Sequence, residues 1–160
     1  MDVKKNRCVA VIRLRGSVGI DKEREYIFKL MHLTRKNHVI LIEDDASTFN
    51  SIRKIKDYVT WGELTSDTIY MLLKKRGMLE GGKKLTENYV KEVLGYSSLK
   101  ELSNAIFDLK VKINELPKVK PIFRLHPPRK GFRGSIKKPY PEGELGGRGE
   151  HINQLLVKMI

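Results

Sequence analysis

The sequence predicts an α+β fold, in which a small β-α-β-α-β sheet domain carries a helical insert and an extended basic loop near its C-terminus. Three observations predict this class. Over residues 7–64, short apolar runs rich in β-branched residues alternate with amphipathic helical patterns. Three further helical patterns follow over 65–116, and all six prolines lie between positions 117 and 141. The 160 residues therefore divide into segments 1–64, 65–116 and 117–160, which we expect to form one domain overall.

Three strands are expected in the first segment. The earliest is the apolar run Cys8–Gly16, which ends at a glycine, and the next is His38–Asp44. Both are rich in valine, isoleucine and leucine, as buried strands are. A third strand is expected in "VTWGEL", which covers Val59–Leu64.

Two helices are expected to connect these strands. Asp21 can cap the first, with Glu23 and Glu25 in its positive first turn. Helical spacing predicts a buried face made of Ile27, Leu30, Met31 and Thr34. The candidate caps of the second helix are Asp45, Ser47 and Thr48, and its predicted apolar stripe is Phe49, Ile52, Ile55 and Val59.

The middle segment is expected to form three short helices that pack as an insert. The first should be capped by Ser66 or Asp67 and stopped by Gly77, and the second should be closed by Gly95. The third begins with Ser98 and Glu101 at the spacing of a capping box. Residues 61–116 carry a net charge of only +1, which favours a packed insert over a charged linker.

The last segment contains two elements that look anchored, with a long excursion between them. Ile122–His126 reads as a returning strand, and the final helix has its apolar side chains at helical spacing: Ile152, Leu155, Leu156 and Met159. The excursion, Pro127–Gly149, is rich in proline, glycine and Lys/Arg and poor in apolar residues. We expect it to find neither a core nor strand pairing within the protein, and to be ordered by an external polyanion.

Charge is the strongest global signal. Lys and Arg number 32 against 19 Asp and Glu, a net charge of +13 with a pI near 9.8. Such an excess indicates a polyanionic partner, either nucleic acid or an anionic membrane surface. The sequence has no apolar run of about 18 residues, so no membrane span is expected. Cys8 is the single cysteine, which excludes a disulfide or cysteine-zinc site and favours a reducing, cytosolic setting.

Two stretches are candidates for binding nucleic acid. Arg124–Tyr140 holds six Lys/Arg and no acidic residue, with Phe132 and Tyr140 between them. Cationic groups neutralise phosphates, and aromatic faces stack on unpaired bases. The loop Arg13–Lys22 enters a helix N-terminus, where free N–H groups suit a phosphate. For this loop, an ordinary strand-to-helix turn is an equally good interpretation.

No catalytic arrangement emerges. The acids of Glu43–Asp45 could hold a metal or act as acid and base, but acids just ahead of a helix are ordinary capping partners. The four histidines are scattered and lack metal-ligand spacing. We therefore predict a binding protein with no metal and no cofactor. Two other functions stay open: a free-standing RNA chaperone or regulator, and an RNA-processing enzyme that uses Glu43–Asp45.

Two long runs carry a family resemblance. "RLRGSVGIDKEREYIFKLMHLTRKNHVILIED" (13–44), followed by a helix and "YVTWGEL", resembles the universal L30 family of large-subunit ribosomal proteins. "IFRLHPPRKGFRGSIKKPYPEGELGGRGEHINQLL" (122–156) resembles the C-terminal extension of that family's long archaeal and eukaryotic members. The chain begins only a few residues before its first strand, so it resembles the archaeal form.

The resemblance implies a structural, non-enzymatic protein with a ferredoxin-like sheet domain, located in the cytoplasmic ribosome. Its implied partners are large-subunit ribosomal RNA, with 5S ribosomal RNA as a candidate, and neighbouring large-subunit proteins. No cofactor, membrane or small-molecule substrate is implied. Together with the charge pattern, it predicts these RNA-binding residues: Arg13, Arg15, Ser17, Lys22, Arg124, His126, Arg129, Lys130, Phe132, Arg133, Lys137, Lys138, Tyr140 and Arg148.

Overall fold

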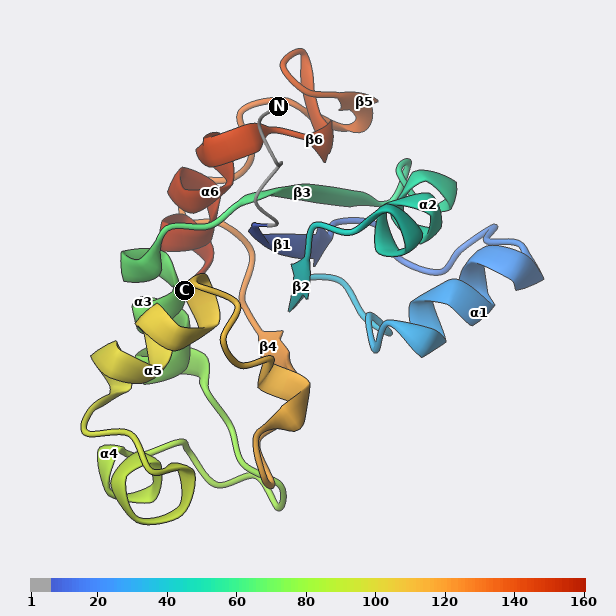
Figure 1. Cartoon of the computed structure of the whole chain (residues 1–160). Coiled ribbons are helices and arrows are strands. Elements are labelled where there is room, and N and C mark those ends of the chain that lie inside the picture. The colour runs from blue at the N-terminus through green and yellow to red at the C-terminus, as the bar shows by residue number, and fades with distance from the viewer. Residues whose placement is uncertain (1–6) are drawn as a thin grey trace, which may run out of the picture.

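A computed structural model describes residues 7–160, which form one six-stranded mixed sheet with helices on both faces (Figure 1). The strands are β1 (Cys8–Arg13), β2 (His38–Glu43), β3 (Val59–Glu63), β4 (Ile122–Arg124), β5 (Ser135–Pro139) and β6 (Gly143–Gly147). Their order across the sheet is β4-β2-β1-β3-β6-β5. The central strands are antiparallel, whereas β6 runs parallel to β3 and to β5. The α+β class is confirmed, and the sheet domain has ferredoxin-like character.

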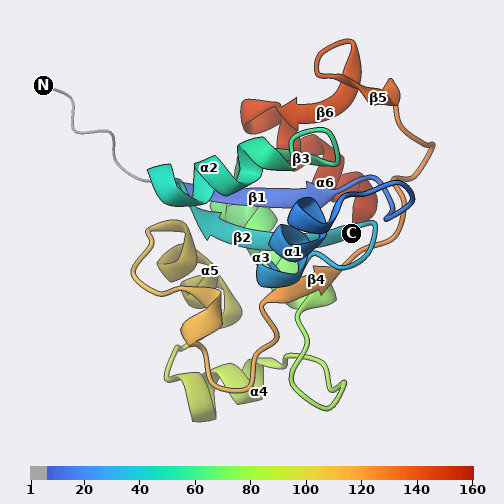
Figure 2. The same ribbon diagram turned by 90° about the vertical axis from the view of Figure 1, so that its right-hand side faces the viewer.

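The helices cover the sheet from two sides. Helices α1 (Lys22–Leu30) and α2 (Ala46–Lys54) lie on one face, and α3 (Ser66–Arg76), α5 (Leu99–Phe107) and α6 (Ile152–Met159) lie on the other (Figure 2). The three-residue α4 (Glu87–Tyr89) continues as a π-helical turn, Val90–Leu94. Single 3-10 turns occur at Ile113–Glu115 and Gly149–His151. Across the described residues, every helix is too short or too polar for a transmembrane span.

Strand alternation divides the interior into two hydrophobic cores. In β1, Ala10 and Ile12 face the core under α3, α5 and α6, and Val11 faces the core under α1 and α2. All six residues of β1 are buried, because the strand has a neighbour on each side and helices above and below it. The first core also takes in residues from the insert and from the C-terminal helix, such as Leu102 and Leu156.

The buried face of α1 differs from the predicted one. Ile27 is buried as expected, but Leu30 is 62% exposed and the helix ends there, so Thr34 lies outside it. Phe28 is buried instead, in the core under α1 and α2, and the guanidinium of Arg13 lies over its ring. Asp21 occupies the predicted N-cap position, but its side chain makes no capping hydrogen bond and pairs with Arg24 at 3.0 Å instead.

Helix caps in the rest of the chain follow the predictions with two corrections. Asp45 caps α2 and Ser98 caps α5, each accepting a hydrogen bond from a backbone N–H three residues later. The predicted capping box of α5 is only half formed, because the Glu101 carboxylate accepts from the Ser97 N–H rather than from the Ser98 N–H. Helix α3 is capped by Thr65 rather than by Ser66 or Asp67, since the Thr65 hydroxyl accepts from the Thr68 N–H. Gly77 and Gly95 end their helices as predicted.

The expectation that Pro127–Gly149 would find neither a core nor strand pairing is wrong. Residues 135–139 and 143–147 form β5 and β6, and β6 extends the central sheet by pairing with β3. Leu145 is buried in the first hydrophobic core, and Phe132 packs partly against it. The excursion is thus an edge of the sheet, and it stays polar because its burial depends on backbone pairing and charged groups rather than on many apolar side chains.

Candidate nucleic-acid interface

Strand direction gathers several loops at one end of the sheet. β1 and β4 finish there, and the other four strands begin there. Loop 14–21, loop 31–37 and segment 125–134 meet at this end, at the right of Figure 2. We call it the basic end, and we define it by seven exposed or half-exposed cations: Arg15, Arg35, Lys36, Arg124, Arg129, Lys130 and Arg133.

Backbone hydrogen bonds hold these three segments side by side. The Asn37 N–H donates to the Arg13 carbonyl at 2.7 Å, and the Leu125 N–H donates to the Asn37 carbonyl at 3.1 Å. The two loops also lie close together, since a Cβ placed on Gly16 would be 3.6 Å from Cε of Lys36. Cations that are far apart in the sequence therefore share one surface.

Segment 125–134 runs from β4 at one edge of the sheet to β5 at the other. Its backbone is fastened to the end of α6, where the His126 and Arg129 N–H groups donate to the carbonyls of Met159 (3.3 Å) and Lys158 (3.0 Å). These bonds satisfy two carbonyls that a helix end leaves without partners. The backbone is fixed in this way, while the side chains of Arg129 and Lys130 stay exposed.

Arg13 organises the basic end from inside. The side chain is buried, and its guanidinium donates to the carbonyls of Arg15 (2.9 Å) and Leu33 (2.6 Å) and to the Ser17 hydroxyl (3.0 Å). Its carbon Cζ lies 3.9 Å from the centre of the Phe28 ring. Burial lowers the pKa of Arg13 below its ordinary value. Arg13 therefore positions loop 14–21 and does not present its charge at the surface.

The other predicted residues of loop 14–21 reach the surface. Arg15 is half-exposed; its guanidinium donates to the Asp57 carbonyl at 3.1 Å and lies over the Tyr58 ring. Ser17 is exposed, as is Lys22 at the first position of α1. The structure thus brings Arg15 and Ser17 close to loop 31–37 and leaves Lys22 at the start of the neighbouring helix.

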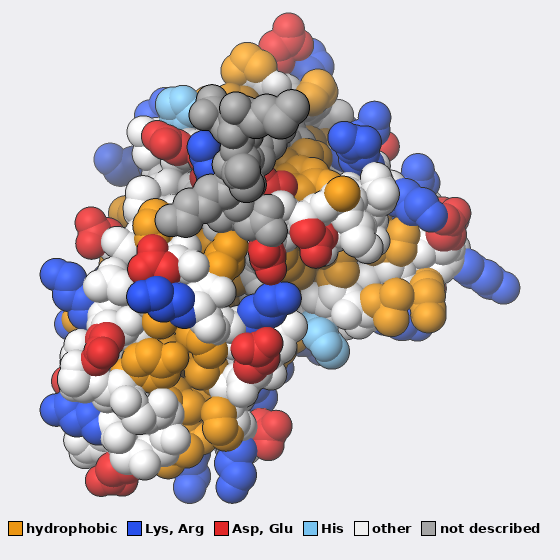
Figure 3. All heavy atoms as spheres, in the orientation of Figure 1, with side chains coloured by type: hydrophobic (Ala, Val, Ile, Leu, Met, Phe, Trp, Pro, Cys, Tyr) orange, Lys and Arg blue, Asp and Glu red, His pale blue; other side chains and the backbone are white. Residues whose placement is uncertain are grey.

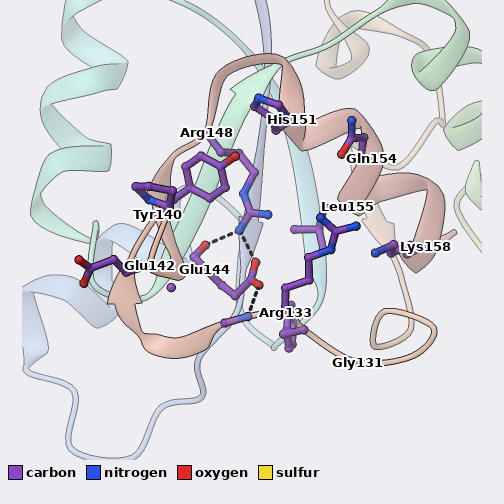
Figure 4. A pocket seen from close by; sticks show the side chains of 14 residues that line it. Gly131, Arg133, Tyr140, Glu142, Glu144, Arg148, His151, Gln154, Leu155 and Lys158 are labelled. Carbon is purple, nitrogen blue, oxygen red and sulfur yellow. Dashed lines mark hydrogen bonds and ion pairs between the residues drawn. The ribbon is translucent and has the colours of Figure 1, made fainter.

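Arg148 is also buried, and it ties β6 to β3. Its Nε donates to the Thr60 hydroxyl at 2.8 Å. Its Nη2 donates to the Glu144 carboxylate at 2.7 Å and to the Glu144 carbonyl (Figure 4). The second oxygen of Glu144 accepts from the Gly134 N–H at 2.8 Å, and Thr60 donates to the Gly146 carbonyl. This buried polar network holds the segment together in place of an apolar core, because the segment has few apolar residues.

The pKa of Glu144 reports the balance of forces in this network. Burial alone would raise it, but the hydrogen bonds from Gly134 and Arg148 outweigh burial and lower the pKa of Glu144 below its ordinary value. The carboxylate is therefore ionised at neutral pH and pairs with Arg148 as a buried salt bridge.

The remaining predicted residues are spread along the C-terminal segment. His126 is half-buried, and its Nδ1 lies 2.7 Å from the carbonyl of the next residue. Lys137 and Lys138 are exposed on β5, at the edge of the sheet opposite Arg124. Tyr140 is half-exposed; the Arg148 guanidinium lies over its ring, and the His151 ring lies near it.

Sequence reasoning missed Arg35 and Lys36 in loop 31–37. The pair stands between a helix and a strand, and its only sequence signal is two adjacent cations without a nearby acid. The register of β1 against β2 brings it beside Arg15. Inclusion of the pair would have required knowing that these strands are antiparallel neighbours.

A buried histidine reports the electrostatic character of the basic end. Burial lowers the pKa of His38, and the positive charges of Arg124, Arg35 and Arg13 lower it further. His38 is therefore neutral at pH 7. Its Nδ1 is buried and has no hydrogen-bond partner within residues 7–160.

The acids Glu43–Asp45 lie at the other end of the sheet, away from the cations. Glu43 forms an ion pair with Lys112 at 3.4 Å, and hydrogen bonds from Thr48 lower the pKa of Asp45, the cap of α2. Figure 3, which faces this end, shows acidic side chains (red) near the centre of the view.

Among the described residues, no group of three or more side chains could ligate a metal ion. The only cysteine, Cys8, is buried, and burial raises its pKa to about 12.

This arrangement defines the chain as a protein that presents a fixed cationic surface built from loops at one end of a sheet. Comparison with known proteins then gives its family. The model of the family described as "Ribosomal protein L30p/L7e" matches residues 9–59. The chain is 48% identical to large ribosomal subunit protein uL30 of Methanopyrus kandleri, over 92% of this chain and 100% of that protein.

Two further relatives of the same name extend the comparison. Identity is 43% with the protein of Archaeoglobus fulgidus, over 94% of this chain and 98% of that protein. It is 44% with the protein of Thermoplasma volcanium, over 95% of this chain and 92% of that protein. The chain therefore belongs to the L30p/L7e family of ribosomal proteins, whose members are structural and not enzymes.

Proposed function

We propose that the chain is a structural constituent of the large subunit of the cytoplasmic ribosome, where it binds and stabilises ribosomal RNA. The basic end contacts the RNA. The protein is located near 5S ribosomal RNA and has neighbouring large-subunit proteins as further partners. One observation carries the proposal: seven cations from three separate segments share one end of the sheet, and none forms an ion pair with a carboxylate within residues 7–160.

The physical role of the basic end follows from its charge and its fixed backbone. Cations offset the repulsion between phosphates where RNA segments converge. A-form RNA hides its major groove, so contacts go mostly to backbone and shape. Because segment 125–134 is fastened to α6 before RNA arrives, the protein loses little backbone entropy when its side chains bind phosphates.

The separation of charges within the fold disfavours the enzyme alternative. A nuclease that used Glu43–Asp45 would need its acids beside the cations that hold the substrate backbone. The structure places the two groups at opposite ends of the sheet, and Glu43 and Asp45 already have partners in the protein. A map of protein–RNA crosslinks from intact cells would test the proposed location, and crosslinks confined to RNAs outside the large subunit would contradict it.

Replacement of Arg129, Lys130 and Arg133 together by alanine should weaken binding to a large-subunit RNA fragment by at least about tenfold at 0.15 M salt. Loss of three phosphate contacts should also reduce the slope of log affinity against log salt by about 2. The measurement is fluorescence anisotropy across a salt series. Because the backbone bonds of this segment remain, the melting temperature should change little.

A matched variant controls for net charge. Lys83, Lys84 and Lys91 are exposed on the insert, and their replacement by alanine removes the same charge away from the basic end. This triple variant should bind RNA nearly as well as the natural protein. Equal losses in the two triple variants would mean that total charge alone determines RNA affinity.

A further inference from the structure

A pocket of about 330 Å³ lies beside the basic end, between segment 131–134, β6 and α6. Figure 4 shows Tyr140 and His151 on one side of it and Arg133 and Lys158 on the other. The buried pair Glu144–Arg148 forms the floor. The pocket thus has aromatic faces on one wall and cations on the other. The strand pairing of the sheet does not depend on this combination of side chains.

The aromatic wall is a preformed stacking surface. The Arg148 guanidinium lies over the Tyr140 ring, with Cζ 5.2 Å from the ring centre, and holds the ring in place. The His151 ring lies 6.0 Å from Tyr140, centre to centre, at an interplanar angle of 35°. Both rings keep part of their surface open to solvent. A flat, uncharged group can therefore contact them without displacing a packed side chain.

The charges that line the pocket determine the orientation of a bound ligand. Arg133 and Lys158 are cations at the rim, and neither forms an ion pair within the described residues. The ionised carboxylate of Glu144 at the floor repels a phosphate. A ligand with a phosphate at one end and a flat ring at the other therefore enters ring first and leaves its phosphate at the rim.

The walls of the pocket have little room to change shape. A Cβ on Gly143 would lie 2.2 Å from the Lys138 carbonyl oxygen, and one on Gly134 would lie 2.8 Å from that of Glu142. The backbone of β5 thus crosses close to that of β6, and the Glu144–Gly134 hydrogen bond locks the crossing. Such rigidity lowers the entropy lost when a ligand is ordered.

We propose that this pocket holds one unpaired nucleotide of RNA, with its base stacked on Tyr140 and its phosphate on Arg133 and Lys158. The inference rests on the proposed function, because segment 125–134 leads directly from the basic end to the pocket. RNA on the basic end can reach it without leaving the protein surface. The pocket adds recognition of an extruded base to a surface that otherwise binds phosphates.

The test compares two single-stranded probes of equal charge. One is an RNA hexamer of adenylates, and the other is a ribose-phosphate hexamer without bases. By fluorescence anisotropy at fixed salt, the natural protein should bind the adenylate hexamer more tightly. Tyr140→Leu should weaken that binding about 5- to 150-fold, as expected for loss of one base–aromatic stack, and should leave binding of the base-free probe unchanged. Tyr140→Phe should retain the natural affinity.

A second pair of variants separates stacking from charge. His151→Ala should lower affinity for the adenylate hexamer only. Lys138→Ala, which removes a cation on β5 outside the pocket, should lower the affinity for both probes equally. Urea unfolding of each variant checks that its fold is intact.

The outcomes distinguish the two proposals. If ribosomal RNA binds with steep salt dependence but Tyr140→Leu matches the natural protein on both probes, the pocket inference is overturned and the proposed function stands. If neither the probes nor a large-subunit RNA fragment binds in a salt-dependent way, both are overturned.

Discussion

Arg148→Met should lower the free energy of unfolding by about 3–5 kcal/mol, the usual cost of removing one partner of a buried ion pair. Methionine fills a similar volume but leaves the Glu144 carboxylate buried without its cation. It also removes the hydrogen bond to the Thr60 hydroxyl, which links β6 to the central sheet. Urea unfolding, followed by circular dichroism at pH 7, measures the change.

Arg129→Met is the matched control for this variant. Arg129 is exposed, and its contact with α6 is made by its backbone N–H, which the substitution keeps. Its free energy of unfolding should stay within about 0.5 kcal/mol of the natural value. RNA affinity, calculated for the folded fraction of each variant, should be lower for Arg129→Met than for Arg148→Met. Equal stability of the two variants would contradict the buried position of Arg148.

The effect of Arg148→Met should depend on pH with a definite sign. In the natural protein the pKa of Glu144 is lowered, so its stabilising contribution is present above its ordinary pKa of 4.5 and is lost as pH falls through the folded value. Without Arg148, its hydrogen bond and its positive charge no longer lower the pKa of Glu144, so that pKa is higher in the variant than in the natural protein. As pH falls, protonation of Glu144 removes the buried charge that has lost its cation, and the variant becomes less unstable relative to the natural protein. The stability difference between the two proteins should therefore be largest near neutral pH and shrink below about pH 4.5.

Hydrophobic periodicity was enough to predict the three central strands and most of the helices. In His38–Asp44 and in the final helix, apolar residues recur at the period of a strand or a helix, and burial by neighbouring elements enforces that period. The exception in α1 involves tertiary contacts. Phe28, and not Leu30, is buried, and its ring contacts the buried Arg13 of β1, a contact between two elements that no local pattern encodes.

The C-terminal excursion was misjudged because its order comes from groups that usually signal exposure. Within 142–149, Leu145 is the one large apolar residue, and Glu144 and Arg148 look like surface charges. Their burial is possible only because each finds the other together with backbone partners. The positive character of the site was predictable from composition, whereas its shape depends on strand direction, which composition does not contain.

Gly62→Ala should be a severely destabilising single-methyl change, by about 3 kcal/mol, because β3 and the start of α6 are in direct contact at this position. An alanine Cβ there would lie 2.1 Å from the Gly149 carbonyl oxygen and 2.7 Å from Cβ of Ile152. To relieve the clash, the 3-10 turn Gly149–His151 must move away from β3. That movement breaks the hydrogen bond from the Arg148 N–H to the Trp61 carbonyl at 3.0 Å.

Gly16→Ala is the matched control, since its new Cβ would lie in ordinary van der Waals contact at 3.6 Å from Lys36. Its midpoint in urea should stay close to the natural value. The double variant Gly62→Ala/Ile152→Ala sharpens the test, because the nearest atom to the new methyl group belongs to the backbone. Truncation of Ile152 cannot relieve that contact and opens a cavity in the core, so the double variant should be less stable than Gly62→Ala alone. Recovery of stability in the double variant would place the clash on the Ile152 side chain instead, and would mean that the turn at Gly149 lies farther from β3.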